Sequence, residues 1–208
     1  MLVKYINNLA YQYSMARDNV KARRIILELL HRPDGSLTKY RMAKETETNI
    51  SWVIALLRKL EERKLVKETK VQDVDKLIDY YLTLEKKSIH FDFFIQEPRE
   101  YFLSQKKTYL LTTYAAENNI SYHLFLTRFD TYVKEEEIQV WKEELFKKGL
   151  LGKGNVRLII PPDPYIFKFT QKIKGLCLVT IPLLLIDLKR EGGVCMQAYE
   201  YLVKKYVS

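Results

Sequence analysis

The segment of residues 20–71 most constrains the fold, because helical apolar patterns there alternate with short polar turns. Ile25, Ile26, Leu29 and Leu30 recur at the spacing of one helix face and predict a helix over residues 20–30. The Pro-Asp-Gly-Ser turn at residues 33–36 ends this helix. The sequence therefore predicts that this segment begins with a short amphipathic helix.

Two further helices and a strand follow this turn. Thr38 is suited to cap a short helix whose Met42 and Ala43 face the core. A turn at residues 46–49 precedes a third helix over residues 51–64, and residues 65–71 then alternate as a strand. That strand would begin a β-hairpin wing, although the segment has no glycine turn. The order of elements predicts a winged helix-turn-helix, which places its recognition helix in the DNA major groove.

A helical wheel divides the third helix into a core face and an outer face. The core face groups Ile50, Val53, Leu57 and Leu60. The outer face carries Ser51, Ala55, Arg58, Lys59 and Glu62, with Trp52 at its edge. Small residues allow close approach to base edges, and Arg and Lys donate hydrogen bonds to bases or phosphates. Two interpretations of Trp52 stay open: contact with a thymine methyl or sugar, or half-buried support of the second helix.

Basic residues on the neighbouring elements complete the expected interface. Lys39, Tyr40 and Arg41 open the second helix, which crosses the phosphate backbone in this motif. Lys67 and Lys70 add phosphate contacts from the wing. Each charge alone is typical of a solvated surface, and their joint placement favours DNA. The predicted DNA-contacting residues are Lys39, Tyr40, Arg41, Ser51, Trp52, Ala55, Arg58, Lys59, Lys67 and Lys70.

The distribution of charge supports this assignment. The 208 residues carry a formal net charge of +9. Residues 1–70 hold 15 Lys/Arg against 8 Asp/Glu, a net of +7, whereas residues 71–208 hold 20 against 18. A basic module joined to a near-neutral domain suits binding to a polyanion, although solubility alone would also explain the excess.

The complete chain is expected to be α+β. Residues 1–72 would hold an amphipathic helix over residues 2–13, either capping the DNA-binding domain or pairing with a second subunit, followed by the winged helix-turn-helix. Residues 73–87 would form a connecting helix, and residues 88–208 a mixed α/β domain. Its expected strands are residues 89–95, 109–113, 131–133, 155–160, 167–170 and 175–180. Its expected helices are residues 114–118, 135–148, 182–191 and 195–207.

The few cysteines and histidines, and the lack of a long apolar segment, limit which cofactors and which cellular compartment the sequence fits. Cys177 and Cys195 lie in apolar surroundings and suggest buried free thiols in a reducing cytosol. Three histidines without metal spacing predict no metal site and no cofactor. The polar residues near the start do not fit a signal peptide, and the apolar run at 176–188 is too short and polar to span a bilayer. We expect a cytoplasmic protein without membrane contact.

Enzymatic interpretations find little support. Gly149-x-x-Gly152-Lys153-Gly154 has glycine where a phosphate-binding loop needs Ser or Thr, so a helix-to-strand turn is preferred. The acids at 135–137 fit the first turn of a helix, and Asp187 would satisfy a buried polar partner. The carboxylates show no spacing for two-metal chemistry. Cys195 near a helix start is best interpreted as buried. We therefore expect a protein that is not an enzyme.

Tyrosine is abundant, at 15 residues, and many occur in the C-terminal half. Two explanations stay open. An exposed subset could form a surface for a partner, or the rings could fill the core and keep their hydroxyls at its rim. The set comprises Tyr101, Tyr109, Tyr114, Tyr122, Tyr132 and Tyr165.

Three runs add a resemblance: Thr112 to Asn118 (TTYAAEN), Gly149 to Leu158 (GLLGKGNVRL), and Ile181 to Cys195 with its Asp-Leu pair and Gly-Gly turn. Together with the winged pattern, residues 20–207 resemble the AbiEi-like antitoxins of type IV toxin–antitoxin systems. The resemblance implies a winged helix that binds its own promoter and an α/β domain with the antitoxin role. It also implies a functional partner toxin of the nucleotidyltransferase type, which the antitoxin need not bind directly.

The sequence therefore predicts a non-catalytic DNA-binding transcription regulator, an autoregulating antitoxin-like repressor that binds double-stranded DNA and could form a homodimer. One alternative is a non-catalytic protein-interaction protein. Another is a nuclease-like or nucleotidyltransferase-like enzyme in the C-terminal domain.

Overall fold

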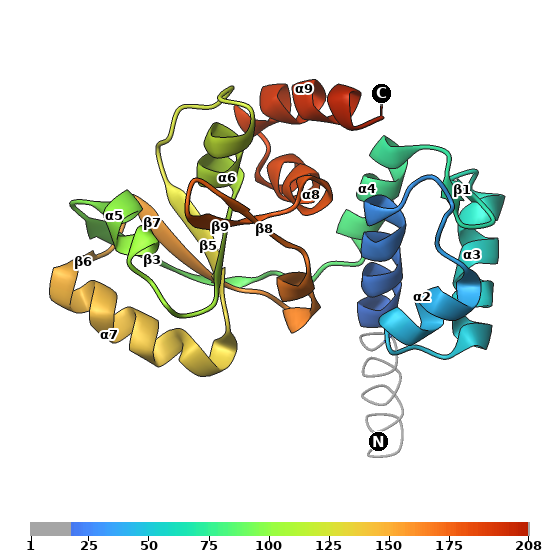
Figure 1. The fold of residues 1–208 in the computed structure, drawn as a ribbon, viewed down its shortest axis with the longest axis horizontal. Helices are drawn as coiled ribbons and strands as arrows, with labels where there is room; N and C mark the ends of the chain where they lie inside the picture. Colours follow the sequence, from blue (N-terminus) through green and yellow to red (C-terminus); the bar gives the residue numbers. More distant parts are fainter. Residues whose placement is uncertain (1–17, 208) are drawn as a thin grey trace, which may run out of the picture. The chain divides into compact units, whose positions relative to one another are not determined.

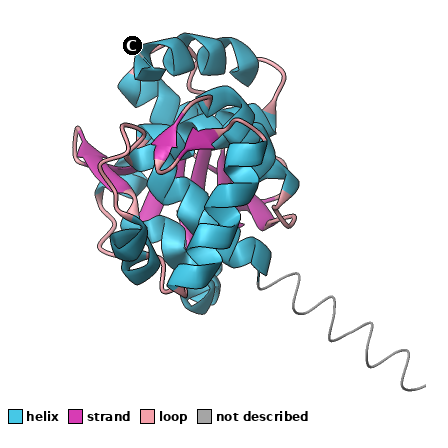
Figure 2. Ribbon diagram, turned by 90° about the vertical axis from the view of Figure 1, so that its right-hand side faces the viewer, coloured by secondary structure: helices cyan, strands magenta, loops and turns pink. Residues whose placement is uncertain are grey.

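A computed structural model describes residues 18–207 and divides the chain into two compact units between Glu85 and Lys86 (Figure 1). Helices and a mixed sheet build the fold, which agrees with the predicted α+β composition (cyan and magenta in Figure 2). The helix expected over residues 2–13 lies outside the described residues.

The first unit contains four helices and a short hairpin among its described residues. The first helix covers residues 18–31, and its predicted inner residues, Ile25, Ile26, Leu29 and Leu30, are fully buried. The later elements are α2 (Lys39–Glu45), α3 (Ile50–Glu62), β1 (Val66–Lys67), β2 (Lys70–Val71) and α4 (Val74–Thr83). Each of these elements buries apolar residues, which joins the helices into one small core.

The segment of residues 65–71 forms a complete hairpin, whereas the sequence predicted only the first strand of one. β1 and β2 pair antiparallel, with Lys67 opposite Lys70. The turn lacks glycine because Glu68 itself takes the left-handed conformation at a φ of 56°. Asp34 adds an isolated antiparallel bridge to Lys70, so a third segment lies beside the hairpin.

Two expectations for this unit need correction. Ile50, assigned to the core face of α3, is 40% exposed, because it begins the helix and its side chain lies at the edge of the buried stripe. Leu56 takes a core position that the wheel did not assign. The helix expected over residues 73–87 is α4, which ends at Thr83 and lies within the first unit.

The second unit is built on a seven-stranded mixed sheet in the order β6-β3-β7-β5-β4-β9-β8. Its strands are β3 (Ile89–Ile95), β4 (Tyr109–Thr112), β5 (Phe129–Val133), β6 (Gly149–Leu151), β7 (Val156–Ile160), β8 (Thr170–Ile173) and β9 (Leu176–Val179). Its α-helices are α5 (Pro98–Leu103), α6 (Thr113–Ile120), α7 (Ile138–Lys148), α8 (Ile181–Glu191) and α9 (Cys195–Val207). The 3₁₀ helices η1 (Glu135–Glu137) and η2 (Pro164–Lys168) complete it.

Alternation along the central strand β5 explains why helices cover both faces of the sheet. All five residues of β5 are buried. Phe129 points to one face, where its ring stacks on Phe102 of α5 at 5.8 Å, beside Trp141 of α7. Asp130 and Tyr132 point to the opposite face, toward α6 and α8 (Figure 1).

A row of charged side chains crosses this second face. Arg157 of β7 lies opposite both Asp92 of β3 and Asp130 of β5. Its guanidinium donates to Asp92 at 2.7 and 3.1 Å. Arg128 donates to Asp130 and, at 2.8 Å, to Glu191 at the end of α8. Alternating signs let these groups lie close together in a partly buried layer.

The structure differs from several predicted boundaries in the second unit. The segment of residues 149–154, expected as a turn, contains the edge strand β6. A Cβ on Gly149 or Gly154 would lie within 2.1 Å of a β3 carbonyl oxygen, so both glycines allow close backbone approach. Of the strand expected at 167–170, the first two residues belong to η2 and only Thr170, where β8 begins, is in a strand. Helix α5 was not predicted, because at 6 residues it is too short for clear periodicity.

Two smaller points concern thiols and membranes. Cys195 is buried as expected, but Cys177 is only half-buried, and both are free. Within residues 18–207, no helix has both the length and the apolar character needed to cross a bilayer.

We expect the Phe102→Ala variant to lose about 3–5 kcal/mol of unfolding free energy. Phe102 is fully buried and contacts four other aromatic rings, so its removal leaves a cavity at the centre of that layer. Urea denaturation followed by circular dichroism measures the loss. The neighbouring Leu103→Ala variant, at an exposed position, is the control; equal losses in both would contradict this assignment of the core.

We expect the Asp92→Asn variant to be less stable than the wild type at about pH 7, with the difference vanishing in acid. Hydrogen bonds from Arg157 hold the pKa of the Asp92 carboxyl below its usual 3.8. Ionised Asp92 therefore stabilises the folded chain fully above the usual pKa of 3.8. This contribution disappears as the pH falls through the lower pKa of the folded state. The midpoints of urea unfolding of the wild type and the variant, compared across pH, measure this difference, and Glu136→Gln is the control. A pH-independent difference would contradict the charge assignment.

Candidate nucleic-acid interface

Side-chain caps fix where α2 and α3 begin. Thr38 Oγ1 accepts a hydrogen bond from the Arg41 amide at 3.2 Å, as the sequence predicted. Asn49 Oδ1 accepts one from the Ser51 amide at 2.8 Å. Between the helices, the Thr46 hydroxyl donates to the Met42 carbonyl at 2.7 Å, and Glu47 takes a positive φ. These contacts make the turn between α2 and α3 rigid.

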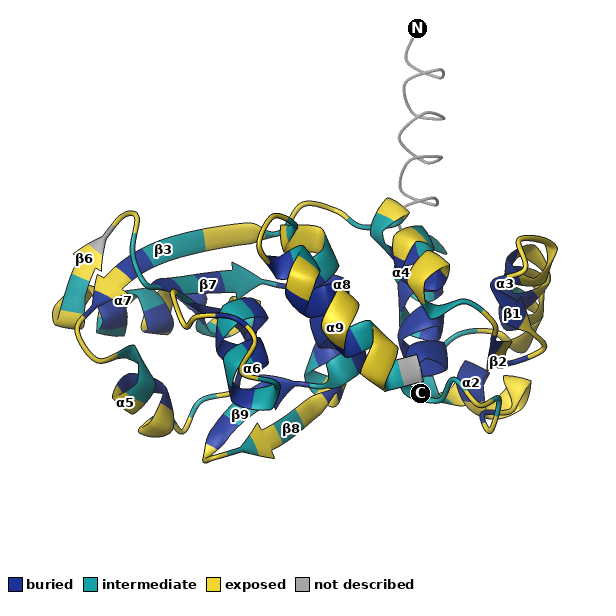
Figure 3. Ribbon diagram, turned by 90° about the horizontal axis from the view of Figure 1, so that it is seen from above, coloured by how far each residue is buried: buried dark blue, intermediate teal, exposed yellow. Residues whose placement is uncertain are grey.

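The outer face of α3 presents three of the predicted residues together. Ser51, Ala55 and Arg58 are all exposed, and Figure 3 shows exposed residues (yellow) along this helix. Ile54 is 41% exposed beside them. Sequence reasoning did not single out Ile54, although its spacing of four from Arg58 places both on one helix face. The surface therefore combines small, apolar and cationic groups.

Lys59 and Trp52 lie on the flank of α3 and not at its centre. The ammonium of Lys59 lies 6.0 Å from the centroid of the Tyr80 ring of α4, and the Arg63 guanidinium lies 5.0 Å from the same ring. Trp52 is half-buried, with the Lys21 ammonium 5.7 Å from its ring. This contact joins Trp52 to helix 18–31 and not to the second helix, so both interpretations of Trp52 stay open.

The start of α2 presents the second predicted group. Lys39, Tyr40 and Arg41 are exposed, with Tyr40 at 72%. Arg41 Nε donates to Glu45 at 2.7 Å, so part of its charge is already neutralised. Lys44 is exposed on the same helix and was missed, although its spacing of four from Tyr40 could have indicated it.

Glu45 also belongs to a small ionic network. Arg32 donates to Glu45 and to Glu28, a carboxylate that is fully buried. The hydrogen bond from Arg32 to Glu45 contributes most to raising the pKa of Arg32, so this guanidinium stays charged at all accessible pH values. Arg32 therefore has a structural role, joining helix 18–31 to α2.

The hairpin brings its two predicted lysines together. Lys67 and Lys70 are exposed and lie opposite each other in register. The Glu68 amide donates to Glu61 Oε1 of α3 at 2.5 Å, which holds the hairpin turn against the end of that helix. Glu61 of α3 thus serves the hairpin, while Glu62 of the outer face is exposed beside the cationic groups.

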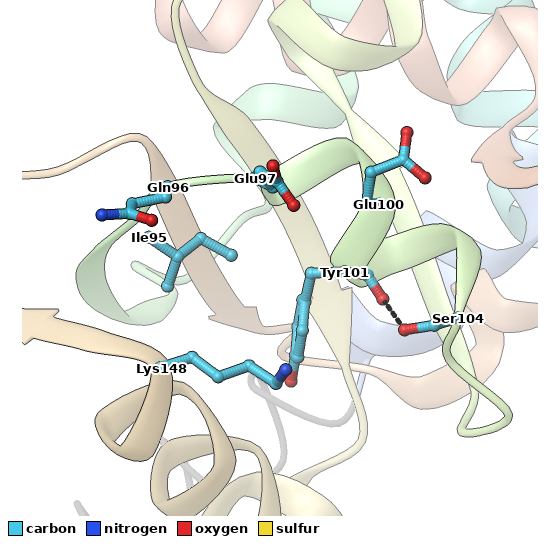
Figure 4. Close-up of a pocket in the computed structure, with 7 residues that line it drawn as sticks. All are labelled: Ile95, Gln96, Glu97, Glu100, Tyr101, Ser104 and Lys148. Atoms are coloured by element: carbon cyan, nitrogen blue, oxygen red, sulfur yellow. Dashed lines mark hydrogen bonds between the residues drawn. The ribbon is translucent and has the colours of Figure 1, made fainter.

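A separate hollow of about 370 Å³ lies in the second unit, lined by Ile95, Gln96, Glu97, Glu100, Tyr101, Ser104 and Lys148 (Figure 4). The Ser104 hydroxyl donates to the Tyr101 carbonyl at 2.8 Å, so its proton is directed to a backbone acceptor and not to a base. The hydroxyl is therefore not activated as a nucleophile. The other polar groups that line the hollow are Gln96, Glu97, Glu100, Tyr101 and Lys148.

Other reactive groups of the second unit have structural partners. Asp130 is buried, and burial raises the pKa of its carboxyl, while Arg128 and Thr113 bind it. Burial also raises the pKa of the Cys195 thiol, which opposes thiolate formation. Among residues 18–207, no group of three or more His, Cys, Asp or Glu side chains is placed to hold a metal ion.

We expect Asn49→Ala to destabilise the first unit by about 1 kcal/mol, because the amide of Ser51 loses its capping acceptor. Asn49→Asp keeps an acceptor and should retain stability, so it serves as the matched control. Thermal unfolding followed by circular dichroism measures both. Equal stability of the Ala and Asp variants would show that the cap does not fix the start of α3.

Comparison of the chain with protein families, with curated proteins and with solved structures gave no match. The functional assignment therefore depends on the residues themselves. The most coherent group is the exposed surface of α3 with its neighbours α2 and the β1–β2 hairpin.

Proposed function

We propose that the first unit is a winged helix-turn-helix and that the protein is a sequence-specific, DNA-binding transcription regulator. The order helix 18–31, α2, α3, β1, β2 supports the motif. The Asp34–Lys70 bridge and the hydrogen bond from the Val71 amide to the Pro33 carbonyl, at 2.9 Å, support a small three-segment wing sheet. In this arrangement α3 is the recognition helix.

The outer face of α3 is the observation that carries the proposal. Ala55 leaves room for a base edge, while Ser51 and Arg58 offer hydrogen-bond donors on the same exposed side. An arginine here can donate two hydrogen bonds to guanine, and exposed Ile54 can contact a thymine methyl.

The neighbouring elements supply contacts to phosphates. Lys67 and Lys70 project from the hairpin, and Lys39 and Lys44 from α2. These positions suit backbone contacts that set register and orientation. Lys59 adds charge from the flank of α3. The net charge of +7 over residues 1–70 is consistent with such a surface.

The resemblance to AbiEi-like antitoxins narrows the proposal. By this resemblance, the protein regulates its own gene through an operator upstream of it. The second unit has the antitoxin role toward a toxin of the nucleotidyltransferase type. A homodimer would place two α3 helices on half-sites about one helical turn apart.

We expect the Arg58→Ala/Lys59→Ala variant to bind upstream DNA more weakly, by about 1–3 kcal/mol for each specific interaction that it removes. Wild-type protein should bind this DNA more tightly than random DNA of equal length, and its affinity should fall steeply with salt. Fluorescence anisotropy across a salt series measures both quantities.

The Lys106→Ala/Lys153→Ala variant removes two exposed positive charges from the second unit and is the matched control. It should bind like wild type. A folded Arg58→Ala/Lys59→Ala variant with unchanged affinity would show that α3 is not the recognition helix. Equal wild-type affinity for upstream and random DNA would contradict specific regulation.

A further inference from the structure

The loop over residues 121–128, between α6 and β5, exposes aromatic side chains that the proposed DNA interface does not use. Phe125 is 89% exposed and Tyr122 is 63% exposed. Exposed apolar and aromatic groups that lie together on a surface are typical of sites that bind a partner. Of the six tyrosines singled out in the sequence, Tyr122 is exposed, whereas Tyr101, Tyr109 and Tyr132 are buried as the core interpretation expected and Tyr114 and Tyr165 are half-buried.

A buried carboxylate makes this loop rigid. Glu117 of α6 is fully buried. Its carboxylate accepts hydrogen bonds from the amides of His123, at 3.2 Å, and Leu124, at 2.7 Å, and from the Ser121 hydroxyl. The side-chain amide of Asn118 donates to the Leu124 carbonyl at 2.8 Å. The exposed rings therefore sit on a fixed backbone.

Backbone strain is concentrated at the same place. Tyr122 takes a φ of 59°, a left-handed conformation that is unusual for an aromatic residue. Such strain persists only where surrounding contacts enforce it, and it is common at functional sites. Here the contacts of Glu117 enforce it and turn the Tyr122 ring outward.

Two neighbouring segments place cations beside these rings. The Lys174 ammonium, in the β8–β9 turn, donates to the Tyr122 hydroxyl and lies 4.6 Å from its ring centroid. The His123 ring stacks on Tyr201 of α9 at 5.3 Å, and the Lys205 ammonium lies 4.4 Å from Tyr201. We call these residues the aromatic platform: Tyr122, His123, Phe125, Lys174, Tyr201 and Lys205.

The charge around the platform is positive, although the second unit is nearly neutral. Residues 121–128 and the β8–β9 segment of residues 170–179 contain no Asp or Glu, and α9 carries two lysines against Glu200 alone. Figure 3 shows exposed residues (yellow) along α9. The surface thus combines stacking groups with cations, which are the two features that single-stranded nucleic acids require.

We propose that the aromatic platform binds single-stranded nucleic acid, with Phe125 as the principal stacking residue. An exposed ring stacks on the face of any base, while Lys174 and Lys205 lie near the phosphates. A duplex keeps its base faces covered and offers nothing for Phe125 to stack on. This activity is distinct from the duplex binding proposed for the first unit.

The test uses the full-length Arg58→Ala/Lys59→Ala protein, so that the cationic surface of α3 contributes little. Fluorescein-labelled oligothymidylate and oligouridylate of about 12 nucleotides are the probes, read by anisotropy at low salt. Tighter binding of one probe shows whether DNA or RNA is preferred. We expect Phe125→Ala to weaken binding about tenfold or more and Phe125→Trp to retain it.

Matched controls separate stacking from general hydrophobicity. Phe146→Ala removes a ring that is 63% exposed on α7 and should bind unchanged. Phe125→Leu stays apolar but cannot stack and should behave like Phe125→Ala. The Lys174→Ala/Lys205→Ala variant should bind more weakly and depend less steeply on salt. Because Phe125 is exposed, its variants should keep the wild-type melting temperature.

Three outcomes would overturn the proposal: no binding of either probe by this protein, equal affinities of the Phe125→Ala and Phe146→Ala variants, or full binding by Phe125→Leu. Competition by unlabelled duplex as effective as single strand would also overturn it. Each result leaves the duplex binding of α3 untouched, because that activity is measured separately with Arg58 and Lys59 present.

Discussion

Two carboxylates, Asp130 and Asp187, are buried between the sheet and the helices of the second unit, and the position of those helices depends on how the charges are satisfied. An unpaired charge in such a layer would cost several kcal/mol. The hydroxyls of Thr112 and Tyr132 donate to Asp187, which attaches α8 to β4 and β5. Asp130 binds Thr113 at the start of α6. Apolar burial stabilises this layer, and the polar pairs select one arrangement of it.

Much of the secondary structure could be predicted, because long apolar periodicities leave little choice. The inner residues of helix 18–31, the cap at Thr38 and the strand at 89–95 all follow from spacing and turn chemistry. Short elements were missed because a few residues have no clear period. Strand β6 is an example, since the glycines at 149–154 look like a turn, and the approach of the β3 backbone explains Gly149 and Gly154.

The candidate sites differ in how far sequence could indicate them. The spacing of Ser51, Ala55 and Arg58 on one helix face is visible in the sequence, and the structure leaves all three exposed. The flanking position of Lys59 depends on Tyr80, a contact between α3 and α4 that no local pattern contains. The aromatic platform could not be predicted either, because three segments distant in sequence form it.

The way Glu117 holds its loop has a consequence for sequence change. Its carboxylate accepts hydrogen bonds from the amides of His123 and Leu124 and from the Ser121 hydroxyl, so a buried residue outside the loop holds the loop backbone as far as Leu124. A substitution of the exposed Phe125 side chain leaves all of these hydrogen bonds in place. The fold thus separates the exposed side chains of the loop from the buried residue that supports its backbone, so the two can change independently.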